Sequence, residues 1–318
     1  MTKRYVGIDL GGTNLKLGLV SAEGEVLDRF STPTESPKGP DHVLQRMADA
    51  VGEIAKAAGL TVADIAAVGV GVPGPVDTAS GVVHFAPNLS CWKDIHVREA
   101  LESRLGCTVV AENDANSAAY GEFRVGAARD VDSMVILTLG TGVGGGIIQN
   151  GRLVRGASDM SAELGHLLVK YGGRLCGCGN RGCLEAYASA TAVVERFRLE
   201  AGVSDLAHQP NLECKAIFEA AYAGDRAAAR IVRETAEYLA VGITNILHAL
   251  NPEMVVLTGG MMGAGDRYLN EVRRAVRDIA FAQTLAGCQI QTSVLGGDAG
   301  IIGTALAAEV VDRTGQLA

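Results

Sequence analysis

Four potential metal ligands lie close together near the middle of the chain. They are one imidazole and three thiols: His166, Cys176, Cys178 and Cys183. Three cysteines and one histidine form the ligand set of a closed, four-coordinate zinc site, and the glycines between them allow tight turns. The alternative is a surface loop with incidental or disulfide-bonded cysteines, but free cysteines rarely cluster with a histidine unless a metal holds them. The spacing predicts one structural Zn²⁺ with no open position for a reacting water.

Two carboxylates, Glu163 and Glu185, flank this metal-ligand stretch. Carboxylates and an imidazole N–H are groups that hydrogen-bond to sugar hydroxyls. A metal bound to one ring nitrogen of His166 would leave the other nitrogen as an oriented donor. We therefore predict that Glu163, His166 and Glu185 bind a sugar and that the zinc holds them in place.

Two glycine-rich turns of similar sequence lie about 130 residues apart, D-L-G-G-T-N at 9–14 and T-L-G-T-G-V at 138–143. Each lies between apolar segments that have the character of strands. Glycine suits a phosphate site because a Cβ would hold the backbone N–H groups away from the phosphate oxygens. Neither turn is a Walker loop or a Rossmann fingerprint. Each alone is equally compatible with a plain hairpin, but the pair predicts one phosphate-binding turn used twice, for a nucleotide with several phosphates.

Two hydroxyl groups and a third glycine turn support a phosphate site. Thr13 and Thr141 add hydroxyl donors, and the third glycine turn occurs at 258–260. The acidic Asp9 beside a phosphate site makes sense only if a cation is also bound, so we expect Mg²⁺.

Asp114 is the acid that we expect to act in catalysis. It comes directly after a short buried strand, where α/β sheets hold their ligands. Phosphoryl transfer requires little of its base beyond position, so an aspartate with an ordinary pKa suffices. Asp114 could also serve as a helix N-cap, a role that does not exclude catalysis.

The elements that position these residues alternate along the chain as in an α/β protein. Strands are predicted at 4–10, 15–20, 26–31, 65–72, 82–85, 108–111, 133–139, 143–149, 254–257 and 289–295. Helices are predicted at 40–58, 94–105, 115–121, 188–201, 212–223, 225–249, 266–282 and 298–311. From the repeated turn we expect a small α/β domain over 1–117, against which a C-terminal helix at about 299–318 packs. A large α/β domain with the zinc loop would cover 118–298.

Composition argues against several function classes. The chain has 318 residues, enough for two domains with separate cores. A net charge of −8 and a pI near 5.3 argue against nucleic-acid binding. Apolar runs stay well short of the roughly 18 residues of a membrane span, and the N-terminus has the pattern of a strand and not of a signal peptide. We expect a cytoplasmic protein with a small-molecule substrate and neither nucleic-acid nor membrane partners.

Seven motifs, in order over nearly the whole chain, resemble those of the ROK family (repressors, ORFs and sugar kinases). They are D-L-G-G-T, V-P-G-P-V-D, P-N-L, E-N-D-A-N, L-G-T-G-V-G-G-G, E-L-G-H and C-G-C-G-N-R-G-C-L-E. The resemblance implies an actin-like ATPase (ribonuclease H-like) fold with two α/β domains around a cleft. It also implies ATP-dependent phosphorylation of a hexose, with the glucokinases that act on the 6-hydroxyl of glucose as the closest type.

The resemblance also implies roles for individual residues. Asp114 would be the base for the sugar hydroxyl. The sugar-binding residues would be Gly71, Asn88, Asn113, Asp114, Glu163, His166 and Glu185. The residues facing Mg·ATP would be Asp9, Gly11, Gly12, Thr13, Thr141, Gly142 and Gly260. The zinc ligands would be His166, Cys176, Cys178 and Cys183. Family members are commonly dimers, so a homodimer or higher homo-oligomer is expected.

Several alternatives stay open at this point. Part of the family consists of transcriptional repressors with an N-terminal helix-turn-helix domain. Because the first strand begins by Arg4 and the chain is acidic, we expect no such domain here. Kinases of N-acetylmannosamine, N-acetylglucosamine, fructose or allose differ only in what surrounds one or two hydroxyls, which the sequence does not decide. Polyphosphate is an alternative phosphate donor.

Overall fold

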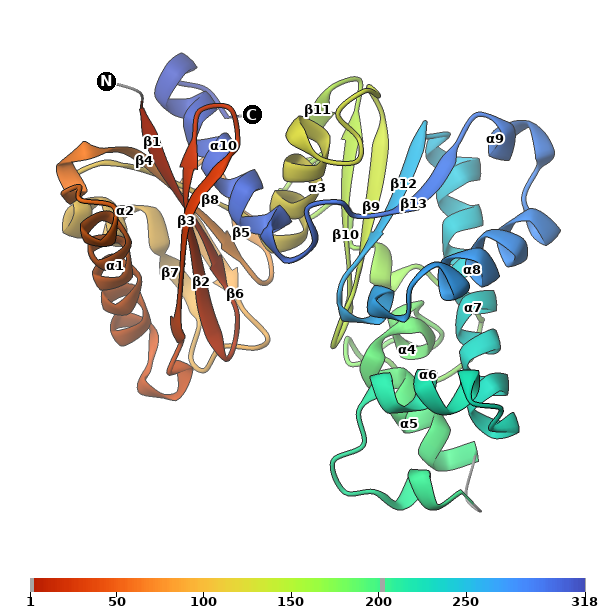
Figure 1. Ribbon diagram of the computed structural model, residues 1–318. Coiled ribbons are helices and arrows are strands. Elements are labelled where there is room, and N and C mark those ends of the chain that lie inside the picture. Colours follow the sequence, from red (N-terminus) through yellow and green to blue (C-terminus); the bar gives the residue numbers. More distant parts are fainter. Residues whose placement is uncertain (1–2, 201–203, 318) are drawn as a thin grey trace. The chain divides into compact units, whose positions relative to one another are not determined.

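The computed structural model describes residues 3–200 and 204–317 (Figure 1). The chain divides into two compact units. The first consists of residues 1–131, 146–162 and 294–318, and the second of residues 132–145 and 163–293. The predicted boundary between residues 117 and 118 falls inside helix α3, Asp114–Val125. The domain assignment stays a prediction.

The first unit contains a five-stranded sheet of order β3-β2-β1-β4-β8. Its strands are β1 (Arg4–Leu10), β2 (Asn14–Ser21), β3 (Val26–Pro33), β4 (Ile65–Val72) and β8 (Thr108–Asn113). The first three form an antiparallel meander, and β4 and β8 continue the sheet parallel to β1. The apolar run predicted as a buried strand at 65–72 is β4, and six of its eight residues in a row are buried at its end.

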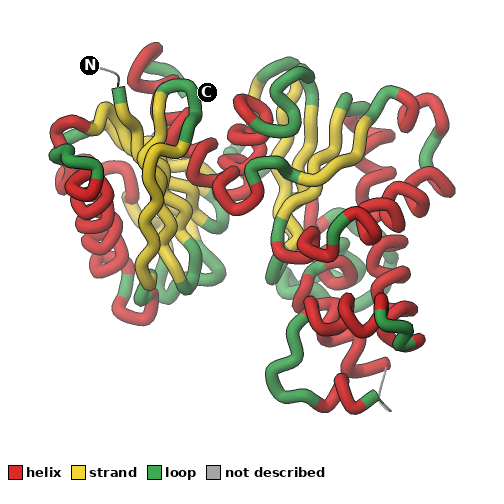
Figure 2. Tube along the Cα trace, viewed as in Figure 1, coloured by secondary structure: helices red, strands yellow, loops and turns green. Residues whose placement is uncertain are grey.

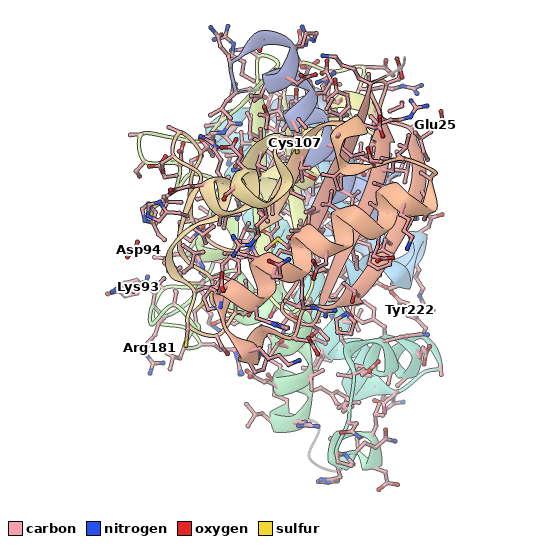
Figure 3. The ribbon with its side chains drawn as sticks, turned by 90° about the vertical axis from the view of Figure 1, so that its left-hand side faces the viewer. Glu25, Lys93, Asp94, Cys107, Arg181 and Tyr222 are labelled. Atoms are coloured by element: carbon pink, nitrogen blue, oxygen red, sulfur yellow. The ribbon has the colours of Figure 1, made fainter. Side chains whose placement is uncertain are left out.

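Helices cover both faces of this sheet. On one face, α1 (Pro40–Ala57) contacts β2, β3 and α2 (Val97–Leu105), and Figure 3 shows α1 lying across the strands. On the other face, α10 (Ala299–Thr314) packs on β1, β4, β8 and α3. This approach is very close, because a Cβ at Gly7 would lie 1.9 Å from the carbonyl oxygen of Ile301 and one at Gly69 1.9 Å from that of Thr304. Glycine in the strands therefore lets α10 rest directly on the sheet backbone.

A second sheet repeats the strand order of the first, as β11-β10-β9-β12-β13. The strands of both sheets are yellow in Figure 2. Its strands are β9 (Met134–Leu139), β10 (Val143–Gln149), β11 (Arg152–Leu153), β12 (Met254–Thr258) and β13 (Gln289–Thr292). A tight hairpin turn joins β10 to β11, with Asn150 and Gly151 both at positive φ. Strands β12 and β13 continue parallel to β9. The repeat seen in the turns therefore extends to whole sheets.

The helices of the second unit come after β11 and β12 in the chain. They are α4 (Glu185–Ala188), α5 (Ala190–Glu200), α6 (Cys214–Tyr222), α7 (Arg226–Leu250), α8 (Asp266–Ile279) and α9 (Ala282–Ala286). The Asp225 carboxylate caps α7 by accepting from the Ala228 N–H. Short 3₁₀ turns are η1 (Ser36–Lys38), η2 (Val62–Asp64), η3 (Leu164–His166), η4 (Asp205–His208), η5 (Gly260–Ala264) and η6 (Gly296–Asp298). No helix among the described residues is long and apolar enough to cross a membrane.

A third, small sheet corrects one prediction. It contains β5 (Val76–Asp77), β6 (Val82–Phe85) and β7 (Lys93–His96). The helix predicted at 94–105 therefore begins only at Val97, because residues 93–96 pair with β6. The loop between β6 and β7 is anchored by the buried Trp92, the only tryptophan.

Three other predicted elements are shorter than expected. The helix predicted at 188–201 is divided at Ser189, which has an extended backbone and whose hydroxyl accepts from the Ala192 N–H; residue 201 lies outside the described residues. The helix predicted at 266–282 ends at Ile279, where Ala280 is extended. The strand predicted at 289–295 ends at Thr292, where its pairing with β12 also ends.

Candidate active site

The first glycine turn joins β1 to β2 and is held by hydroxyl groups. The Gly11 N–H donates to the carbonyl oxygen of Asn14 at 3.0 Å. The Thr34 hydroxyl donates to the Gly11 carbonyl at 2.6 Å, and the Ser36 hydroxyl to the Gly12 carbonyl at 3.2 Å. These bonds fix the orientation of the turn's peptide groups. The turn is therefore a defined backbone surface on which an anion can bind.

Asp9 lies at the end of β1, just before this turn. Burial raises the pKa of its carboxyl group, while the nearby Lys16 lowers it. The carboxylate lies beside the N-terminus of α10, where a Cβ at Gly300 would be 3.9 Å from its Cγ. A half-buried carboxylate whose pKa is raised by loss of water gains much from a bound cation, so this donor fits the expected Mg²⁺.

Asp114 is the first residue of α3, and its neighbour Asn113 caps that helix. The Asn113 side-chain oxygen accepts from the N–H groups of Ala115 at 2.9 Å and Asn116 at 3.0 Å. The N-cap role considered for Asp114 therefore belongs to Asn113. Gly71, on the adjacent strand β4, lies beside Asp114, since a Cβ there would be 3.6 Å from the Asp114 Cα.

An ion pair that the sequence did not predict lies directly before Asp114. Glu112 is buried and accepts from Nε of Arg155 at 2.8 Å. Its other oxygen accepts from the Asn113 N–H at 3.0 Å and from the Asn116 side-chain amide at 3.1 Å. The pair thus fixes the backbone that presents Asp114. The position of Glu112 at a strand end was a usable signal, but nothing in the sequence points to Arg155 as its partner.

The second glycine turn joins β9 to β10. The Gly140 N–H donates to the Gly142 carbonyl at 3.0 Å, and the Gly144 N–H to the Thr138 hydroxyl at 3.1 Å. The Val143 N–H donates to Oε2 of Glu185 at 3.0 Å. The carboxylate predicted to bind sugar therefore also lies on the phosphate turn.

A cavity of about 710 Å³ opens beside this turn in the second unit. Its walls include Gly140, Thr141 and Gly260, together with the side chains of Phe218, Tyr222 and Met261. The volume and largely apolar walls suit a small-molecule ligand such as a nucleoside. The α6 side chains were missed because an amphipathic helix looks the same in the sequence whether its apolar side chains pack in a core or line a cavity.

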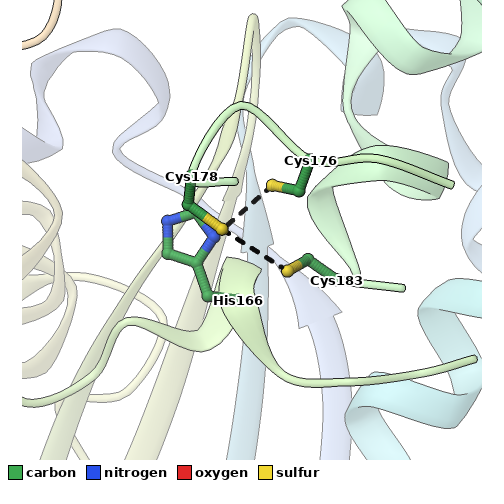
Figure 4. Close-up of side chains that lie close together, drawn as sticks. All are labelled: His166, Cys176, Cys178 and Cys183. Carbon is green, nitrogen blue, oxygen red and sulfur yellow. Dashed lines mark hydrogen bonds between the residues drawn. The ribbon is translucent and has the colours of Figure 1, made fainter. Parts of the chain in front are cut away.

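The four predicted metal ligands come together, as Figure 4 shows. Their ligand atoms all lie within 4.8 Å of one another. The Cys176 Sγ is 3.7 Å from Nδ1 of His166, and the Cys178 Sγ is 3.7 Å from the Cys183 Sγ. A tetrahedron with Zn–S bonds of about 2.3 Å has edges of about 3.7 Å, so the donor set fits zinc. All seven cysteines are free.

The two nitrogens of His166 face different groups. Nδ1 faces the cysteines, and Nε2 lies 3.9 Å from Oε2 of Glu163, beyond hydrogen-bond distance. The η3 turn, which contains His166, packs tightly on β10, since a Cβ at Gly165 would lie 2.0 Å from the carbonyl oxygen of Val143. A zinc ion on Nδ1 would leave an N–H on Nε2, beside Glu163.

The predicted site residues fall on both units. The first unit holds Asp9, Gly11, Gly12, Thr13, Gly71, Asn88, Asn113 and Asp114. The second holds Thr141, Gly142, Glu163, His166, Glu185, Gly260 and the three cysteines of the metal-ligand set. Contacts within the first unit join Gly12 to Asn88, and contacts within the second join Gly142 to Glu185. The roles of these residues stay predictions.

Comparison with known proteins identifies the class and then the family. The neighbouring solved structures have the actin-like ATPase fold, and the duplicated sheet order agrees with it, as predicted. The ROK family model matches residues 5–310, and the chain belongs to this family.

Individual relatives span nearly the whole chain. A glucokinase of Thermotoga maritima is 38% identical over 310 residues, covering 95% of this chain and 96% of the relative. The crystal structure of a ROK family glucokinase from Streptomyces griseus in complex with glucose and AMPPNP is 35% identical, with a TM-score of 0.84, and covers 96% and 99% of the two chains. A putative xylose repressor of a Caldicellulosiruptor species is 32% identical over 94% of this chain and 76% of the relative.

Proposed function

We propose that this protein is an ATP-dependent hexose kinase that phosphorylates the 6-hydroxyl of glucose. The observation that carries the proposal is the similarity to glucokinases along nearly the full length of both chains. The repressor relative is less similar, at 32% identity against 38% for the Thermotoga glucokinase. A kinase is therefore favoured over a sugar-responsive regulator.

Asp114 acts as the base in this proposal. The sugar hydroxyl oxygen attacks the γ-phosphorus, the bond to the β–γ bridging oxygen breaks, and ADP leaves. The hydroxyl proton passes to the Asp114 carboxylate. Because the transition state is loose, position matters more than basicity. The Asn113 cap and the Glu112–Arg155 ion pair support that position.

The two glycine turns would bind the nucleotide phosphates, with hydroxyls from Thr13 and Thr141. Asp9 would hold the Mg²⁺, which neutralises charge on the phosphates when bound. The cavity beside the second turn supports placing the nucleoside there, against Gly260. Polyphosphate stays a second candidate donor.

The sugar would be held by hydrogen bonds from Asn88, Asn113, Glu163, His166 and Glu185, with Gly71 leaving room beside Asp114. Zinc on His166, Cys176, Cys178 and Cys183 would keep the sugar-binding groups of the second unit in shape. It has four protein ligands, so it supplies structure and no activated water. A homo-oligomeric state stays a prediction from the family.

A panel of hexoses tests the proposal. Purified protein with Mg·ATP should release ADP when glucose is added. Fast turnover with an N-acetylated hexosamine and none with glucose would refute the glucose assignment and keep the kinase. No ADP release with any sugar would refute both. Replacing ATP by polyphosphate, with glucose 6-phosphate as the readout, tests the donor.

A further inference from the structure

In the first unit, the phosphate turn packs against the loop that carries Asn88. A Cβ at Gly12 would lie 2.8 Å from the Asn88 carbonyl oxygen and 3.3 Å from its Cβ. The neighbouring Gly11 behaves differently, because a Cβ there would meet only atoms of Asn14, within the same turn. A larger side chain at position 12 would therefore collide with Asn88, which is predicted to bind sugar.

The second unit has the same arrangement with other residues. A Cβ at Gly142 would lie 2.4 Å from Oε2 of Glu185, and that same oxygen accepts from the Val143 N–H at 3.0 Å. By contrast, a Cβ at Gly140 would meet nothing within 4 Å. Each turn therefore contains one glycine that lies directly beside a residue predicted to bind sugar, and one glycine that does not.

This packing has a mechanical consequence. Neither glycine position has space for even one added methyl group, so Asn88 and Glu185 lie directly beside the turn backbone, and the Glu185 carboxylate also accepts from the Val143 N–H at 3.0 Å. Densely packed groups shift together and not independently. A ligand that orders either residue therefore also restricts the phosphate turn beside it.

We propose that Gly12 and Gly142 are positioning residues that link sugar binding to nucleotide binding inside each unit. This inference rests on the proposed function and deepens it. Sugar that fixes Asn88 and Glu185 also orders the two turns, so the nucleotide loses less freedom on binding. Linkage is reciprocal, so the nucleotide tightens sugar binding by the same factor.

Calorimetry with glucose, in the absence and presence of saturating Mg·ADP, measures this linkage. The linkage factor is the Kd for glucose without Mg·ADP divided by the Kd with it. In the wild-type protein, Mg·ADP should lower the Kd for glucose by about fivefold or more. Gly142→Ala should displace the Glu185 carboxylate, weaken glucose binding and reduce the linkage factor to the part that the first unit contributes. Gly12→Ala should reduce the linkage in the first unit.

A matched control lies in the second turn. Gly140→Ala places the same methyl group where it meets nothing within 4 Å, so the linkage factor should stay near the wild-type value even if the nucleotide itself binds more weakly. Melting temperatures identify any variant that fails to fold. Because the two variants test separate units, loss of one leaves the other informative.

Trp92 offers a second readout for the first unit. It is buried in the loop with Asn88, and as the only tryptophan it reports on that loop alone. Mg·ADP without sugar should change its fluorescence in the wild-type protein, and less in Gly12→Ala.

Two results would overturn the inference: a wild-type linkage factor of one, or equal loss of linkage in Gly140→Ala and Gly142→Ala. Neither would touch the proposed function, which ADP release tests separately. A protein that phosphorylates glucose without linkage refutes this inference alone.

Discussion

The two five-stranded sheets have the same strand order but carry different chemistry. At the next-to-last position of the first strand, one sheet has Asp9 and the other Thr138. Burial raises the pKa of the Asp9 carboxyl, which suits a cation, whereas the Thr138 hydroxyl accepts from the Gly144 N–H of its own turn. The same strand order therefore holds a carboxyl group suited to a cation in one sheet, and a hydroxyl group that stabilises its own turn in the other.

The ends of the parallel strands differ in the same way. Strand β8 leads into Asn113 and Asp114, while β13 ends at Thr292 and leads through Ser293 toward α10. The second sheet instead gains its polar groups from the long insertion between β11 and β12, which contains the metal-ligand set. Both sheets thus keep one strand order, and their chemistry differs in the segments that connect the strands.

The largest expected effect concerns the strand ends. Asp114→Asn should lower kcat by about 10²–10⁴-fold, since it removes the proposed base, and leave the Kd for glucose within about threefold. Steady-state kinetics and calorimetry measure both. Ser293→Ala, at the corresponding position after β13, should keep kcat within about twofold. Activity of Asp114→Asn within tenfold of wild type would show that Asp114 is not the base.

Removal of the metal should affect the second unit only. Elemental analysis should find one zinc per chain in the wild-type protein. Cys183→Ala removes a buried ligand, so it should abolish the zinc and lower Tm by about 5–10 °C, because metal binding contributes folding free energy. Cys107→Ala, in the first unit and labelled in Figure 3, should retain the metal. A wild-type protein without zinc would contradict the assignment.

The smallest effects should have opposite signs at the two matching positions. Because burial raises the Asp9 pKa, the fold favours its neutral form, and stability is lost as the pH rises through that pKa. Asp9→Asn should therefore raise Tm by about 2–4 °C at pH 8 without Mg²⁺ or nucleotide, with a smaller gain at pH 4. It should also weaken Mg·ATP binding.

Thr138→Val provides the comparison. It removes the acceptor for the Gly144 N–H and should lower Tm by a similar amount. Thermal melts across pH measure both variants. A lower Tm for Asp9→Asn at pH 8 would contradict the cost assigned to its buried charge.

Local patterns made much of this structure predictable. The strand at 65–72 and the hairpin at Asn150-Gly151 arise from short-range rules, and so does the cap at Asp225. The metal-ligand set was readable because the ligands at 176, 178 and 183 lie close in sequence.

Partners that are distant in sequence left no comparable signal. Arg155 lies 43 residues from Glu112, and the contact of Gly7 with Ile301 joins opposite ends of the chain. The glycines of the turns were predicted because phosphate must approach the backbone, but nothing in the sequence indicated that Asn88 and Glu185 lie against Gly12 and Gly142. The sequence therefore indicated which residues are functional, but it did not indicate which distant residues they contact.

The position of α10 sets an order for folding during synthesis. Strands β1 and β4 leave the ribosome early, but the helix that covers one of their faces is made only after residue 298. The second unit, which ends at residue 293, has by then been translated completely. Domains generally fold as they emerge, so the second unit can form first, while the earlier-made sheet keeps an apolar face uncovered. We expect chaperones to bind the nascent chain at this uncovered apolar face of the first sheet.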